Sequence, residues 1–419
     1  MRLHLINGKR IVKDNILEDI EMVIHNGIIE VIGNDLKGDK VIDLKGNLIT
    51  PGLVDVHVHF REPGFTDKET IKTGSMAAAR GGFTTVCAMP NTNPIPDTPE
   101  KYADIEKIIE EDAVIEVKHY APITHGLRSE ELVDMEGINA FAYTNDGVGV
   151  QTAGTMYLAM KEAVRLNKPI VAHTEDESLL FEGVMHKGLK SEELNLPGIM
   201  GIVESSQVAR DVLLAKETGV HYHVCHVSSK ETVSALRWGQ SMGANVTGEV
   251  APHHLILNEN DIPKDSSIWK MNPPLRSKED QKALLEGLLD GTLAMIATDH
   301  APHTSKEKDG GFVGTPFGIV GIETSFALMY THFVKAGIMT LEFLIDKMAT
   351  QPAKTFGFEV NRLEVGANAN IAVFDIEHEE TINPEEYLSK SSNTPFNGHK
   401  VYGLCQLTLF QGKEVYKNL

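Results

Sequence analysis

Cysteine is scarce in this sequence, which has only Cys87, Cys225 and Cys405 in 419 residues. Three scattered cysteines cannot form a framework of disulfide bonds, so the fold has to depend on a packed core. Long apolar runs are also missing, since none approaches the roughly 18 residues that cross a bilayer. The N-terminus lacks the apolar segment of a signal peptide. We therefore expect a cytoplasmic protein without a membrane-embedded part.

Positive charge is in deficit as well. Lysine and arginine number 39 against 59 aspartates and glutamates, which leaves a formal net charge of −20. This balance disfavours nucleic acid and anionic membranes as partners. An anionic small molecule is not excluded, because a local group of cations can outweigh the average charge.

The two ends of the chain differ from its middle. Residues 1–50 and the C-terminal part consist of short β-branched runs separated by turn signals, and Asn7-Gly8 and Asn26-Gly27 between such runs predict β-hairpins. We expect residues 1–50 and 356–419 to associate into one small β-sandwich domain.

The middle of the chain alternates apolar strands with helical segments. Predicted strands include Thr84–Met89 and Ile170–His173, and predicted helices include Thr152–Leu166 and Glu204–Thr218. About eight such βα units can be counted, a pattern that indicates an α/β fold of the (β/α)₈ TIM-barrel type. We expect this barrel to occupy residues 51–355.

The strongest local signal is the segment Asp55–Arg61, with the sequence DVHVHFR. Alternate residues of a strand face the same side. We therefore expect Asp55, His57, His59 and Arg61 to face inward, and Val56, Val58 and Phe60 to pack against helices. Two imidazoles at this spacing can hold one divalent ion, although the spacing alone is weak evidence.

Further polar residues stand where other predicted strands end. They are His173, His226, Asp299 and, after the fourth strand, Asp146. Barrel enzymes keep their active sites at these strand ends. Four histidines and two carboxylates suffice for two ions with a bridging water, and the donor types suit zinc best without excluding Mn²⁺, Fe²⁺ or Co²⁺. By strand alternation, Cys225 is expected to face away from the ions.

Seven motifs together resemble those of the bacterial class I dihydroorotases, of the amidohydrolase superfamily, over essentially the whole chain. Either HVHFREPG or ATDHAPH alone would also admit allantoinases and hydantoinases. The family implies that His57, His59, His173, His226 and Asp299 bind metal, with two Zn²⁺ per subunit. The motifs are His57–Gly64, Met89–Thr92, Asp146–Gly149, Val171–His173, His223–Ser228, Met271–Arg276 and Ala297–His303.

Many members of the superfamily bridge their two metals with a carboxylated lysine at the end of the fourth strand. Here that strand, Ala140–Thr144, contains no lysine. The resemblance implies that Asp146 takes this place and bridges or caps the metals. Lys118, one strand earlier, is then expected to be unmodified.

The resemblance implies reversible hydrolysis of the cyclic amide of (S)-dihydroorotate to N-carbamoyl-L-aspartate, a step of pyrimidine biosynthesis. A metal-activated bridging hydroxide would attack the ring, with Asp299 as general base and then general acid. Arg61, two residues beyond His59, is placed to fork onto the substrate carboxylate. The family adds Asn91 and His303 at that carboxylate, and Asn272 with the backbone of Phe317-Gly318 at the ring amide.

Two alternatives stay open. One is a related cyclic amidase, either an allantoinase or a dihydropyrimidinase, and the other is a non-catalytic scaffold that supports aspartate transcarbamoylase. A homodimer and an association with aspartate transcarbamoylase are family expectations. The segment Thr304–Gly314 can be read either as a lid over the site or as an ordinary solvated loop.

Overall fold

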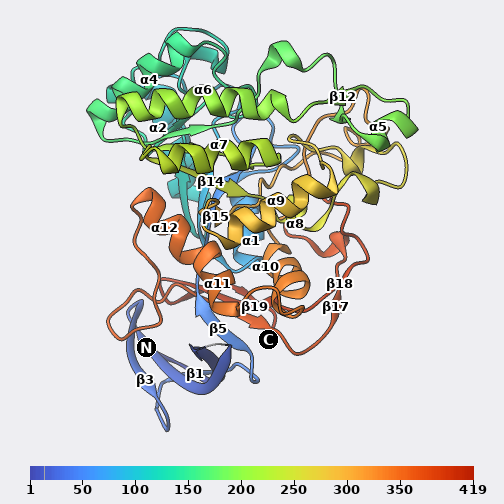
Figure 1. Cartoon of the computed structure of the whole chain (residues 1–419). Helices are drawn as coiled ribbons and strands as arrows, with labels where there is room; N and C mark the ends of the chain where they lie inside the picture. Colours follow the sequence, from blue (N-terminus) through green and yellow to red (C-terminus); the bar gives the residue numbers. More distant parts are fainter. Residues whose placement is uncertain (14) are drawn as a thin grey trace.

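The computed structural model describes residues 1–13 and 15–419 (Figure 1). Two parallel sheets form the centre of the chain, one of three strands and one of five. The predicted α/β class is confirmed. The strands are, in chain order, β6 (Leu53–Val58), β7 (Phe83–Ala88), β8 (Glu116–His119), β9 (Tyr143–Thr144), β10 (Ile170–Ala172), β13 (Tyr222–Val224), β14 (Val246–Val250) and β15 (Met295–Ile296).

Parallel bridges join the two sheets at both edges. Ala121, just after β8, pairs with Tyr143 of β9, and Val58 of β6 pairs with His300, which follows β15. The backbone N–H of His59 donates to the carbonyl of His300 at 2.8 Å at the second junction. The eight strands therefore follow one another in a cyclic order, which is the order that the barrel prediction requires.

Helices follow most of these strands and cover the outside of the ring (Figure 1). The predicted helices at 152–166 and 204–218 are confirmed to within two residues. Thr152 caps the first of them by accepting from the N–H of Thr155, and Asn167 ends it in a left-handed conformation. The α-helices among the described residues are α1 (Ile71–Arg80), α2 (Pro99–Asp112), α3 (Met135–Ile138), α4 (Ala153–Leu166), α5 (Leu189–Glu193), α6 (Ile202–Thr218), α7 (Lys230–Ser241), α8 (Pro252–Ile256), α9 (Lys278–Leu289), α10 (Ser325–Met329), α11 (Leu341–Ile345) and α12 (Gln351–Phe356).

Both ends of the chain share one further sheet of eight strands, and both termini lie in the lower part of Figure 1. The C-terminal strand β16 pairs antiparallel with β5, which leads into the ring. Leu5, Met22, Ile371 and Leu409 belong to its separate apolar core. The strands are β1 (Arg2–Lys13), β2 (Ile16–His25), β3 (Ile28–Gly33), β4 (Lys40–Asp43), β5 (Leu48–Pro51), β16 (Ile371–Asp375), β19 (Leu404–Phe410) and β20 (Lys413–Lys417).

Of the two hairpins predicted near the N-terminus, one is confirmed and one is wrong. Asn26 and Gly27 have φ values of 51° and 79° and join β2 to β3, as a tight hairpin turn requires. At Asn7-Gly8 the strand β1 continues, and its pairing with β2 shifts register between Leu5 and Gly8. A left-handed asparagine serves a β-bulge as well as a turn, and the pairing partners decide between the two.

Val56 was predicted to pack on the helix side, and this is wrong. Val56 belongs with Val54 to an apolar cluster that also contains Cys87 and Tyr120, whereas Val58 packs in the large cluster with the helices. The pairing of β6 with β7 shifts register between Asp55 and Val58. This irregularity changes which residues of the strand face inward, so strict alternation fails across it.

Candidate metal centre

The structure brings together all six side chains that were predicted to bind metal. They come from the carboxyl ends of four strands, β6, β10, β13 and β15, and from the loop after β9, and each is at most 6% exposed. Several of their nitrogen and oxygen atoms lie within 4 Å of one another. The residues are His57, His59, Asp146, His173, His226 and Asp299.

These side chains form two groups, each with donor atoms within 4.8 Å of one another. One consists of His57, His59 and Asp299, and the other of Asp146, His173 and His226. Oδ1 of Asp146 lies 3.4 Å from Nε2 of His57 and 3.8 Å from Nε2 of His226. Asp146 therefore stands between the groups, as a residue shared by two cations would.

Buried atoms that could donate to a metal but lack a hydrogen-bond partner show whether a cation fits the site. Nε2 of His57 and Oδ1 of Asp146 are buried and have no hydrogen-bond partner among the described residues. Nδ1 of His173 and Nε2 of His226 converge to 2.9 Å. Buried polar atoms are normally satisfied, so unsatisfied nitrogen and oxygen atoms that face one another fit divalent cations.

Three site residues have left-handed backbone conformations. The φ values are 61° for Arg61, 31° for His226 and 50° for Asp299. Residues with a side chain rarely adopt this region, and such conformations cluster at functional sites. Each of the three follows the end of a strand, where the turn of the backbone redirects the side chain.

Cys225 was predicted to face away from the site, and this is wrong. Its sulfur belongs to a group of possible metal donors with His57 and Asp146. Alternation along β13 carries His223 and then Cys225 to the inside of the ring, and the left-handed His226 breaks the pattern immediately afterwards. Burial raises the pKa of the Cys225 thiol well above its usual value, so it is protonated at neutral pH.

Glu249 of β14 is a site residue that the sequence reasoning missed. Its Oε1 lies 2.6 Å from Nδ1 of His57 and accepts from the backbone N–H of His226 at 3.2 Å, while Oε2 lies 3.0 Å from Nε2 of His223. Burial opposes the charge, but His57 and His223 outweigh it and hold the pKa of Glu249 at about 2. A glutamate inside the apolar strand Val246–Val250 was the available signal, because a charge there requires partners.

Arg61 and His303 lie next to the metal groups. Nη2 of Arg61 is 3.3 Å from Nε2 of His303, and Nε of Arg61 donates to the carbonyl of Pro302 at 3.1 Å. Within residues 1–13 and 15–419, no carboxylate lies within ion-pair distance of this partly buried guanidinium. Burial lowers the pKa of Arg61 to about 10, which leaves it charged at neutral pH.

The other predicted substrate residues also border the centre. Oδ1 of Asn91 lies 3.0 Å from Nδ1 of His59, and Nδ2 of Asn272 donates to Glu175, which lies 3.7 Å from His173. His303 Nε2 lies 2.8 Å from the carbonyl of Phe317. Gly318 follows with a φ of 133°, and a Cβ there would come within 2.8 Å of Cβ of Ala301.

Lys118 lies outside both metal groups. Its ammonium pairs with Glu116 at 2.8 Å and stands 4.9 Å from the centre of the Phe358 ring. That Lys118 is unmodified stays a prediction.

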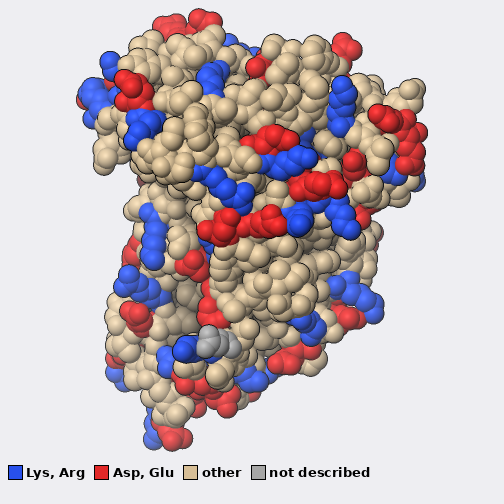
Figure 2. Space-filling model, in the orientation of Figure 1, with Lys and Arg blue, Asp and Glu red and all other residues tan. Residues whose placement is uncertain are grey.

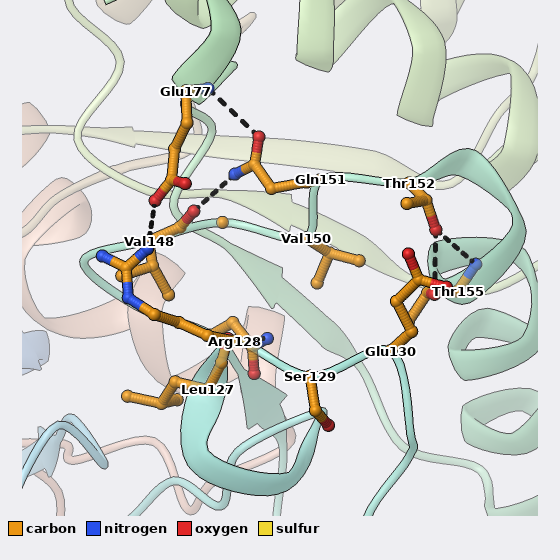
Figure 3. Close-up of a pocket in the computed structure, with 12 residues that line it drawn as sticks. Leu127, Arg128, Ser129, Glu130, Val148, Val150, Gln151, Thr152, Thr155 and Glu177 are labelled. Atoms are coloured by element: carbon orange, nitrogen blue, oxygen red, sulfur yellow. Dashed lines mark hydrogen bonds and ion pairs between the residues drawn. The ribbon is translucent and has the colours of Figure 1, made fainter.

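A separate hollow of about 100 Å³ adjoins the loop that carries Asp146. Figure 3 shows Arg128 and Glu177 directed toward one another there, at a distance of 2.6 Å. Gln151 spans the carbonyls of Val148 and Glu175 beside it. None of the six predicted metal ligands lines this hollow.

Charge on the surface follows a different pattern from charge at the centre. On the face in Figure 2, acidic and basic side chains lie beside one another. The ion pair of Arg237 and Asp290, 2.6 Å apart, is one example of such pairing on the protein surface. Within the described residues, no helix combines the length and apolar character that crossing a membrane demands.

Comparisons with known proteins identify relatives of this chain over most of its length. A family model described as Dihydro-orotase-like matches residues 46–232. The chain is 58% identical to a dihydroorotase of Enterococcus faecalis, covering 98% of both chains, and 57% identical to one of Ligilactobacillus salivarius, covering 95% of both. Among solved structures, the L-hydantoinase (dihydropyrimidinase) of Arthrobacter aurescens is similar with a TM-score of 0.87 and 25% identity, over 99% of this chain and 96% of that one.

Proposed function

Because this chain belongs to the dihydroorotase family, we propose that it catalyses the reversible hydrolysis of (S)-dihydroorotate to N-carbamoyl-L-aspartate. The observation that carries the proposal is the charged Arg61, which stands beside His303 and the metal groups without a carboxylate partner among the described residues. A partly buried guanidinium without a counter-ion is costly unless a ligand supplies one. The carboxylate of dihydroorotate is such a ligand.

The centre would hold two divalent cations, which we propose are Zn²⁺. His57, His59 and Asp299 would hold one, His173 and His226 the other, and Asp146 both. When bound, such ions lower the pKa of water and polarise a carbonyl group. The donor set of imidazole nitrogens and carboxylate oxygens suits zinc.

The remaining steps belong to the side chains of the chain itself. Asp299, beside His59 at 3.1 Å, would take the proton from the attacking water and return it to the ring nitrogen as the amide bond breaks. Burial raises its pKa in isolation, but His57 and His59 outweigh burial and keep Asp299 ionised. A carboxylate in this state can act as the base.

Substrate orientation would come from two sides. Arg61, His303 and Asn91 would hold the substrate carboxylate, and the fork of Arg61 fixes its plane. Asn272 and the backbone of Phe317-Gly318 would hold the ring amide. Together these contacts keep the scissile bond next to Asp299.

The larger organisation is proposed on the same basis. The cyclic order of eight strands supports a (β/α)₈ barrel over residues 51–355, and the sheet built from both chain ends supports a small β-sandwich domain of residues 1–50 and 356–419. We also propose a cytoplasmic homodimer. An association with aspartate transcarbamoylase remains a family-based proposal.

One assay tests the activity. The purified protein is given dihydroorotate, dihydrouracil or allantoin before chelation, after chelation, and after Zn²⁺ is restored. We expect ring opening of dihydroorotate that chelation abolishes and Zn²⁺ restores. Preference for dihydrouracil or allantoin would assign the chain to another cyclic amidase, and metal-loaded protein inactive on all three would indicate a scaffold.

A further inference from the structure

Lys308 is a buried lysine within the segment Thr304–Gly314. It is 5% exposed, and its Nζ donates to the backbone carbonyls of Lys270 at 3.1 Å and Pro316 at 3.0 Å. In the part of the chain that the structure describes, no carboxylate lies within ion-pair distance of this ammonium. Burying a lysine without a counter-ion is unfavourable. The buried position of Lys308 therefore needs a reason, and its two carbonyl contacts point to one.

Both carbonyls belong to the backbone around the proposed ring-amide site. The carbonyl of Lys270 also accepts from the N–H of Gly318 at 3.0 Å, so Lys308 and Gly318 share one acceptor. Pro316 directly precedes Phe317. Lys308 therefore holds the carbonyl just before Phe317 directly and is linked to the N–H of Gly318 through the carbonyl of Lys270.

Asn393 and His303 also contact the backbone at Phe317-Gly318. The carbonyl of Gly318 accepts from Nδ2 of Asn393 at 3.0 Å, and Cδ2 of His303 would lie 3.1 Å from a Cβ on Gly318. The carbonyl of Phe317 meets His303 Nε2 at 2.8 Å. A small shift of this segment would move both the ring-amide contacts and His303.

A second lysine reinforces the arrangement. Lys270 is 4% exposed, its ammonium donates to the carbonyl of Thr315, and it stands 4.1 Å from the centre of the Phe317 ring. The side chains of Lys270 and Lys308 thus hold the backbone of residues 315–318 through the carbonyls of Thr315 and Pro316.

We propose that Lys308 is a positioning residue for substrate binding, which clamps the backbone of Phe317-Gly318 through the carbonyls of Lys270 and Pro316. The inference rests on the proposed function, because it assigns these backbone groups to the substrate ring. It deepens that function by adding a residue that touches neither the substrate nor the metals.

The test compares Lys308→Met with Lys306→Met, a matched change at an exposed lysine of the same segment. For Lys308→Met we expect the KM for dihydroorotate to rise about tenfold, as the loss of two buried hydrogen bonds implies, while kcat stays within about threefold. Metal content should be unchanged. Lys306→Met should match the parent in all three.

Hydrogen exchange at the amide of Gly318 gives a second readout that needs no substrate. We expect faster exchange in Lys308→Met than in Lys306→Met. Unchanged exchange would overturn the clamp, and faster exchange with an unchanged KM would reduce Lys308 to a structural role. If Lys308→Met does not fold, Lys308→Gln replaces it, since an amide can donate to one of the two carbonyls.

The two proposals can fail separately. If the parent hydrolyses dihydrouracil or allantoin and not dihydroorotate, the proposed function fails, and the KM comparison is made with the accepted substrate. If no substrate is hydrolysed, hydrogen exchange alone decides whether Lys308 holds Gly318.

Discussion

Glu249 accepts a hydrogen bond from Nδ1–H of His57 at 2.6 Å, which leaves Nε2 of the same ring directed at Asp146 and Asp299. The carboxylate thereby selects the tautomer that offers Nε2 to a cation. Since the same oxygen also accepts from the backbone of His226, one buried side chain supports a ligand from each metal group.

Glu249→Gln should weaken metal binding about 10- to 100-fold, because an amide is a weaker acceptor for Nδ1–H than a carboxylate. Competition with a chromogenic chelator measures this directly. Glu116→Gln is the control, because Glu116 is an exposed carboxylate at the start of β8. Equal affinities in Glu249→Gln and the parent would contradict the assigned role.

Asp299→Ala should keep the fold but reduce kcat by about 10²- to 10⁴-fold, because it removes the proposed proton carrier. The assay is run with saturating Zn²⁺ and measured metal content, since Asp299 also belongs to a metal group. Substantial turnover by the folded, metal-loaded variant would assign the base to another residue.

Arg61→Lys should raise the KM for dihydroorotate about tenfold or more, because a point charge cannot reproduce the two-pronged contact with a carboxylate. Dihydrouracil lacks that carboxylate and provides the internal control. Any residual activity on it should change little. A similar loss on both substrates would point to a structural effect.

Lys118→Ala should retain bound metal and dihydroorotate hydrolysis, because Lys118 lies outside both metal groups. Metal analysis of the variant provides one check. The intact mass of the parent provides the other and should match the unmodified sequence. A carboxylated Lys118 in the parent, or a loss of metal in Lys118→Ala, would make Lys118 the bridge in place of Asp146.

The stability of the parent relative to Lys308→Met should depend on pH. Burial, followed by the nearby charge of Lys270, lowers the pKa of Lys308 from 10.5 to about 7. Between these values the unfolded chain retains a proton that the folded chain releases, so the cost of the buried charge is full below pH 7 and falls as pH rises. As pH rises, the parent should therefore gain unfolding free energy relative to Lys308→Met, by at most about 1.4 kcal/mol per pH unit.

Denaturant titrations from pH 7 to 9 measure this difference. Glu307 and Lys270, the charged groups that face Lys308, are the same in both proteins and cancel in the comparison. If the unfolding free energy of the parent minus that of Lys308→Met falls as pH rises, the pKa of Lys308 is not lowered by burial.

Several features were determined by the sequence alone. Polar residues at the ends of apolar strands, such as His173 after Ile170–Ala172, identified the six side chains that converge, because parallel strands carry their carboxyl ends to one rim. Asn26-Gly27 likewise predicted its hairpin, since its two residues readily adopt positive φ. The sequence predicts a feature when that feature depends on neighbouring residues alone or on the direction of a strand.

Other features were decided by the tertiary structure. The inward face of β6 changes at a register shift with β7, and the left-handed His226 brings Cys225 and His226 to the same site. Glu249 and Lys308 acquire their roles only through partners far away in the chain. Alternation describes one strand in isolation, whereas bulges, left-handed turns and buried charges are stabilised by contacts that form only when the ring closes.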